Sequence, residues 1–153
     1  MAIRSSSDRP DTTGLQGPGV LTAYIDGGSR GNPGPAGYGV RLEDESGAVI
    51  AELSAPVGIA TNNVAEYRGL LAALLWAVDH GLPALHIRSD SELLVRQMRG
   101  EYRVKHPGLQ PLHQDARALV ARLGRVTFEH VRREHNAEAD RLANLAMDQA
   151  GQA

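Results

Sequence analysis

The order of hydrophobic patterns along the chain constrains its fold more than any other feature of the sequence. Three segments with the pattern of β-strands come first, and short turns rich in Gly, Asn, Ser and Pro separate them. A long segment with helical spacing follows, and strands and helices then alternate. Strands joined by short turns pair antiparallel, whereas strands reached through a helix can pair parallel. The order therefore predicts an α/β domain with a mixed sheet.

The expected elements follow the order βββαβααβα. The clearest is a helix over residues 63–80, in which apolar residues recur at helical spacing before Gly81 and Pro83 stop it. Strands are predicted at residues 20–26, 38–42, 48–57, 84–88 and 125–131. Further helices are predicted at residues 91–98, 107–123 and 136–150. Residues 27–37, crowded with Gly, Asn and Pro, are expected to form an irregular turn.

The 153 residues are expected to form one domain at residues 19–150, behind a flexible tail at residues 1–18. The tail is rich in Ser, Asp, Thr, Gly and Pro and has no hydrophobic period. A hydrophobic content of 42% excludes wholesale disorder. The most apolar stretch, residues 70–78, is about half the roughly 20 residues that span a bilayer, and no signal-peptide core is present. We therefore expect a soluble, cytoplasmic protein without a membrane partner, and we expect a monomer.

Cysteine content and charge bear on the metal and on the partner. The chain has no cysteine, so a bound metal would be held by oxygen or imidazole, and a hard cation such as Mg²⁺ is the natural candidate. A net charge of −2 argues against a nucleic-acid partner, because such domains usually carry a basic face. The cations are nearly all Arg, however, with Lys105 the only lysine, and the guanidinium group suits phosphate.

Four carboxylates stand near the ends of expected elements, and each also has an ordinary structural explanation. Asp26 ends the first strand before two glycines, where an Asp–Gly turn would explain it. Glu66 follows Asn63 at the spacing of a capping box. Asp90, or the serine after it, would cap the next helix. Asp140 would be a solvated charge on the last helix.

The four carboxylates take on another meaning as a group, because ligands collect at the carboxyl ends of strands in an open sheet. Four carboxylates at close range would raise each other's pKa, and divalent cations would remove that penalty. Two such ions about 3.5–4 Å apart can activate a water and stabilise the leaving oxygen of a phosphodiester. The sequence therefore indicates a site for two Mg²⁺ ions, with Mn²⁺ as a possible substitute.

The motifs around these carboxylates resemble those of the type 1 ribonuclease H family. The stretch YIDGGSRGNPGPAGYG at residues 24–39 is similar to the family signature. TNNVAE at residues 61–66, SDS at 89–91 and HNAEAD at 135–140 match the other three motifs in the same order. The resemblance covers about residues 20–148. It implies a five-stranded mixed sheet, three antiparallel strands then two parallel, flanked by helices. It also implies hydrolysis of the RNA strand of an RNA–DNA hybrid, which leaves 5′-phosphate and 3′-hydroxyl ends.

The resemblance assigns roles to individual residues. Asp26 would bridge both metals, Glu66 and Asp90 would complete the site of the leaving-group ion, and Asp140 would hold the ion that carries the attacking water. Thr61 is similar in position to a residue that grips a phosphate of the DNA strand, although helix-end capping explains it equally well. The residues implied to contact the hybrid in its minor groove, where 2′-hydroxyls are displayed, are Gly28, Ser29, Asn32, Asn62 and Asn63.

This chain departs from the family pattern in its basic region and near one RNA contact. Many relatives carry a long basic insertion after the second helix, whereas residues 100–108 here offer only Arg103, Lys105 and His106. The departure implies weaker and more salt-sensitive binding of the hybrid. Glu92 occupies a position where relatives often place an amide that touches RNA.

A second departure lies in the loop before the last helix, which in relatives often carries a histidine that assists turnover. Here the loop is compressed to Arg132, Arg133 and Glu134. His135 is nearest, but it matches the residue that opens the helix motif, and a structural role is favoured over catalysis. The two arginines either take over part of the histidine's role or form a solvated basic pair.

Three alternatives to a hybrid-specific nuclease are open. The first is a ribonuclease H-like module that binds nucleic acid without cutting it. The second is a nuclease that also acts on double-stranded RNA, since the short basic region could relax selection. The third is an interaction domain in which every carboxylate is a cap or a surface charge.

Overall fold

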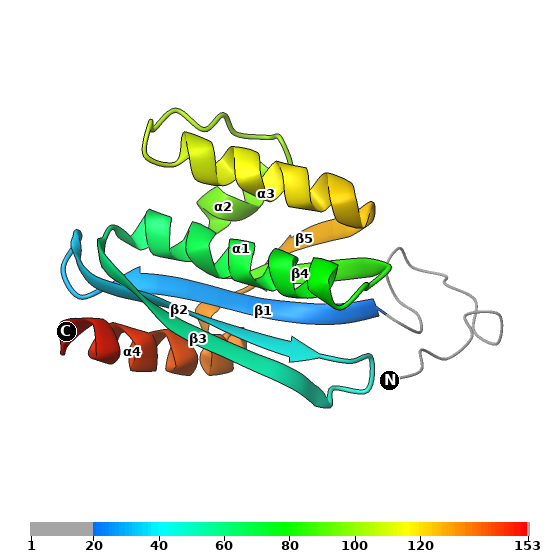
Figure 1. Ribbon diagram of the computed structural model, residues 1–153, viewed down its shortest axis with the longest axis horizontal. Coiled ribbons are helices and arrows are strands. Elements are labelled where there is room, and N and C mark those ends of the chain that lie inside the picture. Colours follow the sequence, from blue (N-terminus) through cyan, green and yellow to red (C-terminus); the bar gives the residue numbers. More distant parts are fainter. Residues whose placement is uncertain (1–19, 153) are drawn as a thin grey trace, which may run out of the picture.

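The computed structural model describes residues 20–152, so the tail predicted at residues 1–18 lies outside the described residues. Five strands form one sheet: β1 (Val20–Ser29), β2 (Gly34–Glu43), β3 (Val49–Ala60), β4 (Ala84–Ser89) and β5 (Val126–His130). Their order across the sheet is β3-β2-β1-β4-β5. β1 and β3 both pair antiparallel with β2, whereas β4 pairs parallel with β1 and β5. The predicted mixed sheet is therefore confirmed (Figure 1).

Helices cover both faces of the sheet (Figure 1). One face carries α1 (Asn62–Asp79), α2 (Glu92–Met98) and α3 (Gln110–Leu123), and the other carries α4 (Ala137–Gly151). A short 3-10 turn, Arg133–His135, precedes α4. α1 packs on β1 and α3, while α4 packs mainly on β2 and β3. Among residues 20–152, no helix has the length and apolarity needed to cross a membrane.

The main core lies between the sheet and α1. Alternate residues of β1 point into it, and Leu70 and Leu74 of α1, both fully buried, meet them at helical spacing. Burial of a leucine side chain stabilises a fold by roughly 1.5–3 kcal/mol. One polar contact lies within this core, because the Tyr67 hydroxyl donates to Oε1 of Gln97 at 2.7 Å. This bond ties α1 to α2.

The irregular turn predicted at residues 27–37 is much shorter than expected. β1 continues to Ser29 and β2 begins at Gly34, so only residues 30–33 lie outside the strands. The glycines suggest a turn in the sequence, but several of them lie in strands where a helix packs closely against the backbone. A Cβ on Gly27 would lie 2.4 Å from the carbonyl carbon of Ala65 in α1, and one on Gly37 would lie 2.4 Å from Cβ of Ala146 in α4. Glycine therefore lets strand backbone approach helix backbone on both faces of the sheet.

The third helix also differs from its prediction, because α3 begins at Gln110 and not at residue 107. Pro111 occupies the first turn of α3, where its missing N–H needs no partner. Pro107, which marks the start in the sequence, belongs to the turn before the helix.

Candidate metal centre and active site

Strand register places Asp26 beside Asp90. Ile25 of β1 is the parallel partner of Ser89, the last residue of β4. The residues that follow these two partners are Asp26 and Asp90, which therefore lie side by side. The sequence placed Asp26 at the end of its strand, and this is wrong. Asp26 lies inside β1, paired with Gly39 of β2, and it is β4 that ends beside it. Because β4 ends at Ser89 while β1 continues, the Asp26 carboxylate on β1 is left accessible.

Glu66 reaches the same place from α1. The N-cap of α1 is Thr61, whose Oγ1 accepts from the Val64 N–H at 3.2 Å, and Asn63 lies inside the helix. The capping box built on Asn63 is therefore wrong, and Glu66 is not needed at the helix end. Its carboxylate instead accepts a hydrogen bond from Ser91.

Asp90 is not needed as a cap either. Ser91 is the N-cap of α2, because its Oγ accepts from the Leu94 N–H at 3.2 Å. The Ser89 hydroxyl accepts from the Ser91 N–H at 3.0 Å and completes the turn. The two serines that flank Asp90 therefore satisfy the backbone, and the carboxylate is left to the site.

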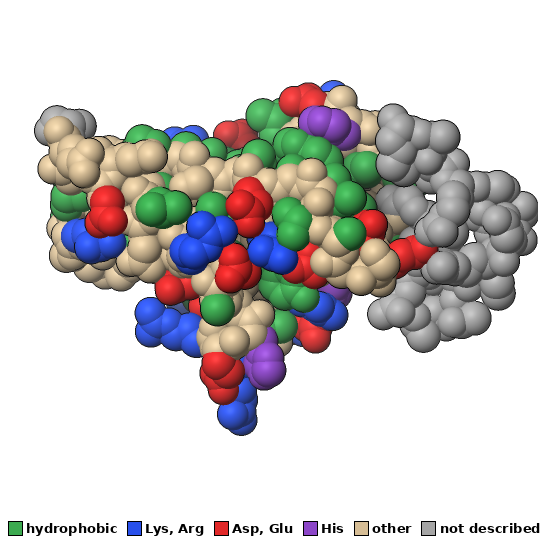
Figure 2. Space-filling view, turned by 90° about the horizontal axis from the view of Figure 1, so that it is seen from below, with side chains coloured by type: hydrophobic (Ala, Val, Ile, Leu, Met, Phe, Trp, Pro, Cys, Tyr) green, Lys and Arg blue, Asp and Glu red, His purple; other side chains and the backbone are tan. Residues whose placement is uncertain are grey.

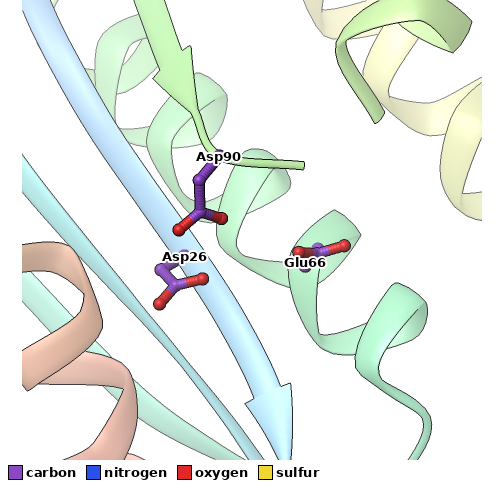
Figure 3. A group of neighbouring side chains, drawn as sticks. All are labelled: Asp26, Glu66 and Asp90. Atoms are coloured by element: carbon purple, nitrogen blue, oxygen red, sulfur yellow. The ribbon is translucent and has the colours of Figure 1, made fainter. Parts of the chain in front are cut away.

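The carboxylates from these three elements converge. One oxygen each of Asp26, Glu66 and Asp90 lies within 4.8 Å of the others, from β1, α1 and the end of β4 (Figure 3). Asp140, from the first turn of α4, borders the same cavity, and its charge contributes to the raised pKa of Asp26. The cavity is open and has a volume of about 800 Å³. Four distant segments of the chain thus meet at one acidic centre.

Burial and mutual repulsion raise the pKa values of the carboxyl groups in this centre. Burial, followed by the charges of Asp90 and Asp140, raises the pKa of Asp26 to about 8. Burial and the charge of Asp90 raise the pKa of Glu66 to about 7, against the hydrogen bond from Ser91. The pKa of Asp90 is also raised by burial, although a hydrogen bond from Asn136 and the charge of Arg133 oppose the shift.

The donor set suits a hard divalent cation. It consists of carboxylate oxygens, which Mg²⁺ and Mn²⁺ accept as ligands, and it contains no sulfur. Cations would also remove the repulsion that raises these pKa values. The residues present therefore fit a divalent metal site.

Comparison with known proteins agrees with this geometry. A family model described as "Reverse transcriptase-like" matches residues 24–146. The bifunctional protein Rv2228c of Mycobacterium tuberculosis is 54% identical over 129 residues, which are 83% of this chain and 35% of that protein. The structure of the N-terminal RNase H domain of Rv2228c, fused to maltose binding protein, superposes with a TM-score of 0.84 at 49% identity, over 87% of this chain and 96% of that one. The chain belongs to the ribonuclease H family.

Two further ribonucleases H support the assignment. The ribonuclease HI of Halobacterium salinarum is 42% identical over 132 residues, 86% of this chain and 66% of that protein. LC11-RNase H1, isolated from compost and solved in complex with an RNA/DNA hybrid, has a TM-score of 0.81 at 44% identity, over 85% of this chain and 98% of that one. The prediction that the chain belongs to the ribonuclease H family is confirmed. The chain spans about a third of the length of the mycobacterial relative.

Most residues with an implied substrate role lie around the ribonuclease H centre. Gly28, Ser29, Asn62 and Asn63 border the cavity. Asn62 also ties the β1–β2 turn to α1, because its Oδ1 accepts from the Ser29 N–H at 2.8 Å and its own N–H donates to Oδ1 of Asn32 at 3.0 Å. Thr61 is the helix cap, and its role toward a phosphate stays a prediction.

His135, the histidine nearest in sequence to the loop position, does not border the centre. His135 lies in the 3-10 turn and lines a separate hollow beside Tyr24 and Arg41. His130, the last residue of β5, borders the cavity instead and partners Ser89 in the parallel register. The rule that ligands gather at strand ends would have found His130, since β5 ends beside β4.

Two asparagines were also missed. Asn136 is 1% exposed, and its Nδ2 donates to the Ile25 carbonyl at 2.8 Å, which ties the start of α4 to β1. It lies within the HNAEAD motif, but its burial could not be read from the motif. Asn144, one turn beyond Asp140, also borders the cavity.

Charges outside the centre are mixed. Figure 2 shows acidic and basic side chains side by side on the face that carries α4. Ion pairs join Arg41 of β2 to Glu52 of β3 at 3.5 Å and to Glu138 of α4 at 3.3 Å, and Arg141 of α4 contacts both carboxylates. These arginines are already paired, so they add little to a basic face.

Proposed function

We propose that this ribonuclease H is an endonuclease that cuts the RNA strand of RNA–DNA hybrids with two Mg²⁺ ions and leaves 5′-phosphate and 3′-hydroxyl ends. The observation that carries the proposal is the convergence of Asp26, Glu66 and Asp90 within 4.8 Å, beside Asp140 in one open cavity. The hybrid bound by LC11-RNase H1 supports the substrate.

The four carboxylates would divide the two ions between them. Asp26 is clustered with Glu66 and Asp90 and borders the same cavity as Asp140, so it is the ligand that both ions would share. Glu66 and Asp90 would complete one ion site and Asp140 the other. When bound, two such ions activate a water and stabilise the leaving oxygen of an in-line displacement. Ser91 and Asn136 would orient Glu66 and Asp90 through the hydrogen bonds that they already make.

Recognition of the RNA strand would fall to the rim of the cavity. Gly28, Ser29, Asn62 and Asn63 offer backbone groups, a hydroxyl and amides beside the carboxylates. Such groups can bond to 2′-hydroxyls in the minor groove, which distinguish RNA from DNA. Asn32 would support Asn62, and Thr61 would hold the start of α1 where it can meet a phosphate of the DNA strand.

The test compares labelled RNA–DNA hybrid, duplex RNA and duplex DNA with Mg²⁺ at low salt. We expect cleavage of the RNA strand of the hybrid, and we expect Asp26→Asn to abolish it while the protein stays folded and still binds the hybrid. Cleavage of duplex RNA would favour the broader nuclease, and binding without cleavage would favour the non-cleaving module. An active Asp26→Asn variant would refute the site. We also propose that residues 19–150 act as a cytoplasmic monomer, which gel filtration and cell fractionation test.

A further inference from the structure

Asp140 is held by a side chain from its own helix. Asn144 follows it by one turn of α4, and its Nδ2 donates to the Asp140 carbonyl at 2.9 Å and to Asp140 Oδ2 at 3.3 Å. Residues four apart lie on the same face of a helix, so the contact follows from the spacing. One carboxylate oxygen of Asp140 is thereby occupied and the other is left for the centre.

The orientation of the Asn144 amide is fixed by the groups on either side of it. Arg30, in the turn between β1 and β2, donates through an Nη atom to Asn144 Oδ1 at 3.1 Å. A guanidinium group can only donate and a carbonyl oxygen can only accept, so Oδ1 must face Arg30 and Nδ2 must face Asp140. The same Nη atom pairs with the Asp148 carboxylate at 2.9 Å. The arginine is therefore held against α4 by two residues of that helix.

We infer that Asn144 is a positioning residue for Asp140 as a metal ligand, and that Arg30 acts through Asn144. This inference rests on the proposed function. Asp140 borders the same cavity as Asp26, and two like charges at close range repel each other unless a cation or a donor holds them. The Asn144 amide is that donor for Asp140, and it selects one orientation among the rotamers open to a side chain on the first turn of a helix. Hydrogen bonds of this kind typically change metal affinity or activity by about 10- to 100-fold.

The experiment measures cation affinity apart from cleavage. Mn²⁺ is titrated into the protein by calorimetry without nucleic acid, and Mg²⁺ dependence of cleavage is measured separately. We expect Asn144→Leu, which keeps a similar volume but has no donor, to weaken the affinity for Mn²⁺ by about 10-fold or more. Cleavage by this variant should need more Mg²⁺, while the KM for the hybrid at saturating Mg²⁺ stays within about twofold of wild type.

Three further variants separate positioning from a structural effect. Asn144→Gln keeps an amide that can donate a hydrogen bond to Asp140 one turn away, so it should retain most of the Mn²⁺ affinity that Asn144→Leu loses. Gln149→Leu makes the same chemical change at an exposed position of α4 and should leave the affinity unchanged. Arg30→Met should weaken the affinity less than Asn144→Leu does, and the double variant should be no weaker than Asn144→Leu alone.

The outcomes distinguish this inference from the proposed function. Equal Mn²⁺ affinity in the wild type and in Asn144→Leu would overturn the inference alone, and so would an equal loss in Gln149→Leu. A wild-type protein that binds no divalent cation and cuts no hybrid would overturn the proposed function and the inference together.

Discussion

Asp26 and Glu66 lie where β1 and α1 meet backbone to backbone, whereas Asp140 lies on the first turn of α4 and is held by side chains. On the inner side, a Cβ added to Gly27 would lie 2.4 Å from the carbonyl carbon of Ala65. A Cβ added to Gly69 would lie 3.2 Å from the Asp26 carbonyl oxygen. On the outer side, Asn144 and Arg30 hold Asp140, and the Arg30 side chain is 48% exposed. We call these the inner and outer sides of the centre.

The difference teaches which parts of the centre tolerate change. Main-chain contacts on the inner side hold together the backbone segments that carry Asp26 and Glu66, and burial raises the pKa of both. Side chains on the outer side can be replaced singly, and water can enter. We expect substitutions on the inner side to abolish cleavage at every cation concentration. We expect substitutions on the outer side to lower the cleavage rate partially, and higher cation concentrations should restore part of it.

The largest effect expected from this comparison separates Glu66 from Asp140. Glu66→Gln should lower single-turnover cleavage by more than about 100-fold at every Mn²⁺ concentration, because no other side chain in the cluster can replace this ligand. Asp140→Asn should lose as much at low Mn²⁺ and regain part of it at high Mn²⁺. The measurement is cleavage rate against cation concentration. The same response in both variants would remove the distinction between the two sides.

A second prediction tests the inner contact directly. Gly27→Ala should lower the free energy of unfolding by about 3 kcal/mol or more, because the new methyl group has no space beside the Ala65 backbone. A loss of this size lowers the melting temperature by roughly 6–12 °C. Gly151→Ala, whose Cβ would lie 3.9 Å from Pro35, is the matched control and should be nearly neutral. A melting temperature for Gly27→Ala within about 2 °C of wild type would show that β1 and α1 can separate.

Stability against pH gives a third prediction. The folded protein holds the pKa of Asp26 at about 8 and that of Glu66 at about 7, above their ordinary values of 3.8 and 4.5. It therefore binds these protons more tightly than the unfolded chain does, and this contribution to stability is lost as pH rises from about 4 through 8. In the presence of a chelator, the wild type should lose stability relative to Asp26→Asn over this range, and Mg²⁺ should restore it.

Thermal melts at several pH values, with chelator and with Mg²⁺, check this prediction. Asp140→Asn should remove less of the pH dependence than Asp26→Asn, since it takes away only one of the charges that raise the pKa of Asp26. A chelated wild type whose stability relative to Asp26→Asn does not change between pH 5 and 8 would contradict the raised pKa of Asp26.

The smallest effect concerns the arginines at the outer rim. Arg133 lowers the pKa of Asp90 through its charge, whereas the Arg132 side chain is 81% exposed and its nearest partner is Glu134 at 3.9 Å. Arg133→Met should therefore slow turnover by a few-fold, and Arg132→Met by less than about twofold. Steady-state rates at two salt concentrations measure both effects, since salt screens such charges. Equal rates for the two variants would favour a solvated basic pair.

Sequence patterns predicted the order of the elements and the mixed sheet, and the motifs indicated four carboxylates that border one cavity in the structure. They failed where a residue type has two uses. Glycine marks turns and also close packing, so the sequence predicts a turn over residues 27–37 and a strand end at Asp26, whereas the strand continues to Ser29. Thr61 and Asn63 are both good caps, and only the structure shows that the helix begins after Thr61.

Contacts between distant segments could not be predicted from pattern at all. Arg30 and Asn144 are 114 residues apart in the sequence, and nothing local indicates that they bond. His130 stands at the end of a strand that the sequence predicts, but only the pairing of that strand with β4 brings it to the cavity. These residues lie on the outer side, so the centre was predictable where it depends on motifs and unpredictable where it depends on tertiary contacts.

The glycine contact between β1 and α1 also bears on how this protein can change over time. The separation of Asp26 from Glu66 is set by main chain touching main chain, so it does not depend on which leucines or alanines fill the interior. The interior can drift through substitutions of similar volume while the reactive geometry stays constant. Stability and chemistry can therefore be adjusted separately, and variants adapted to heat or cold should keep the same spacing of carboxylates.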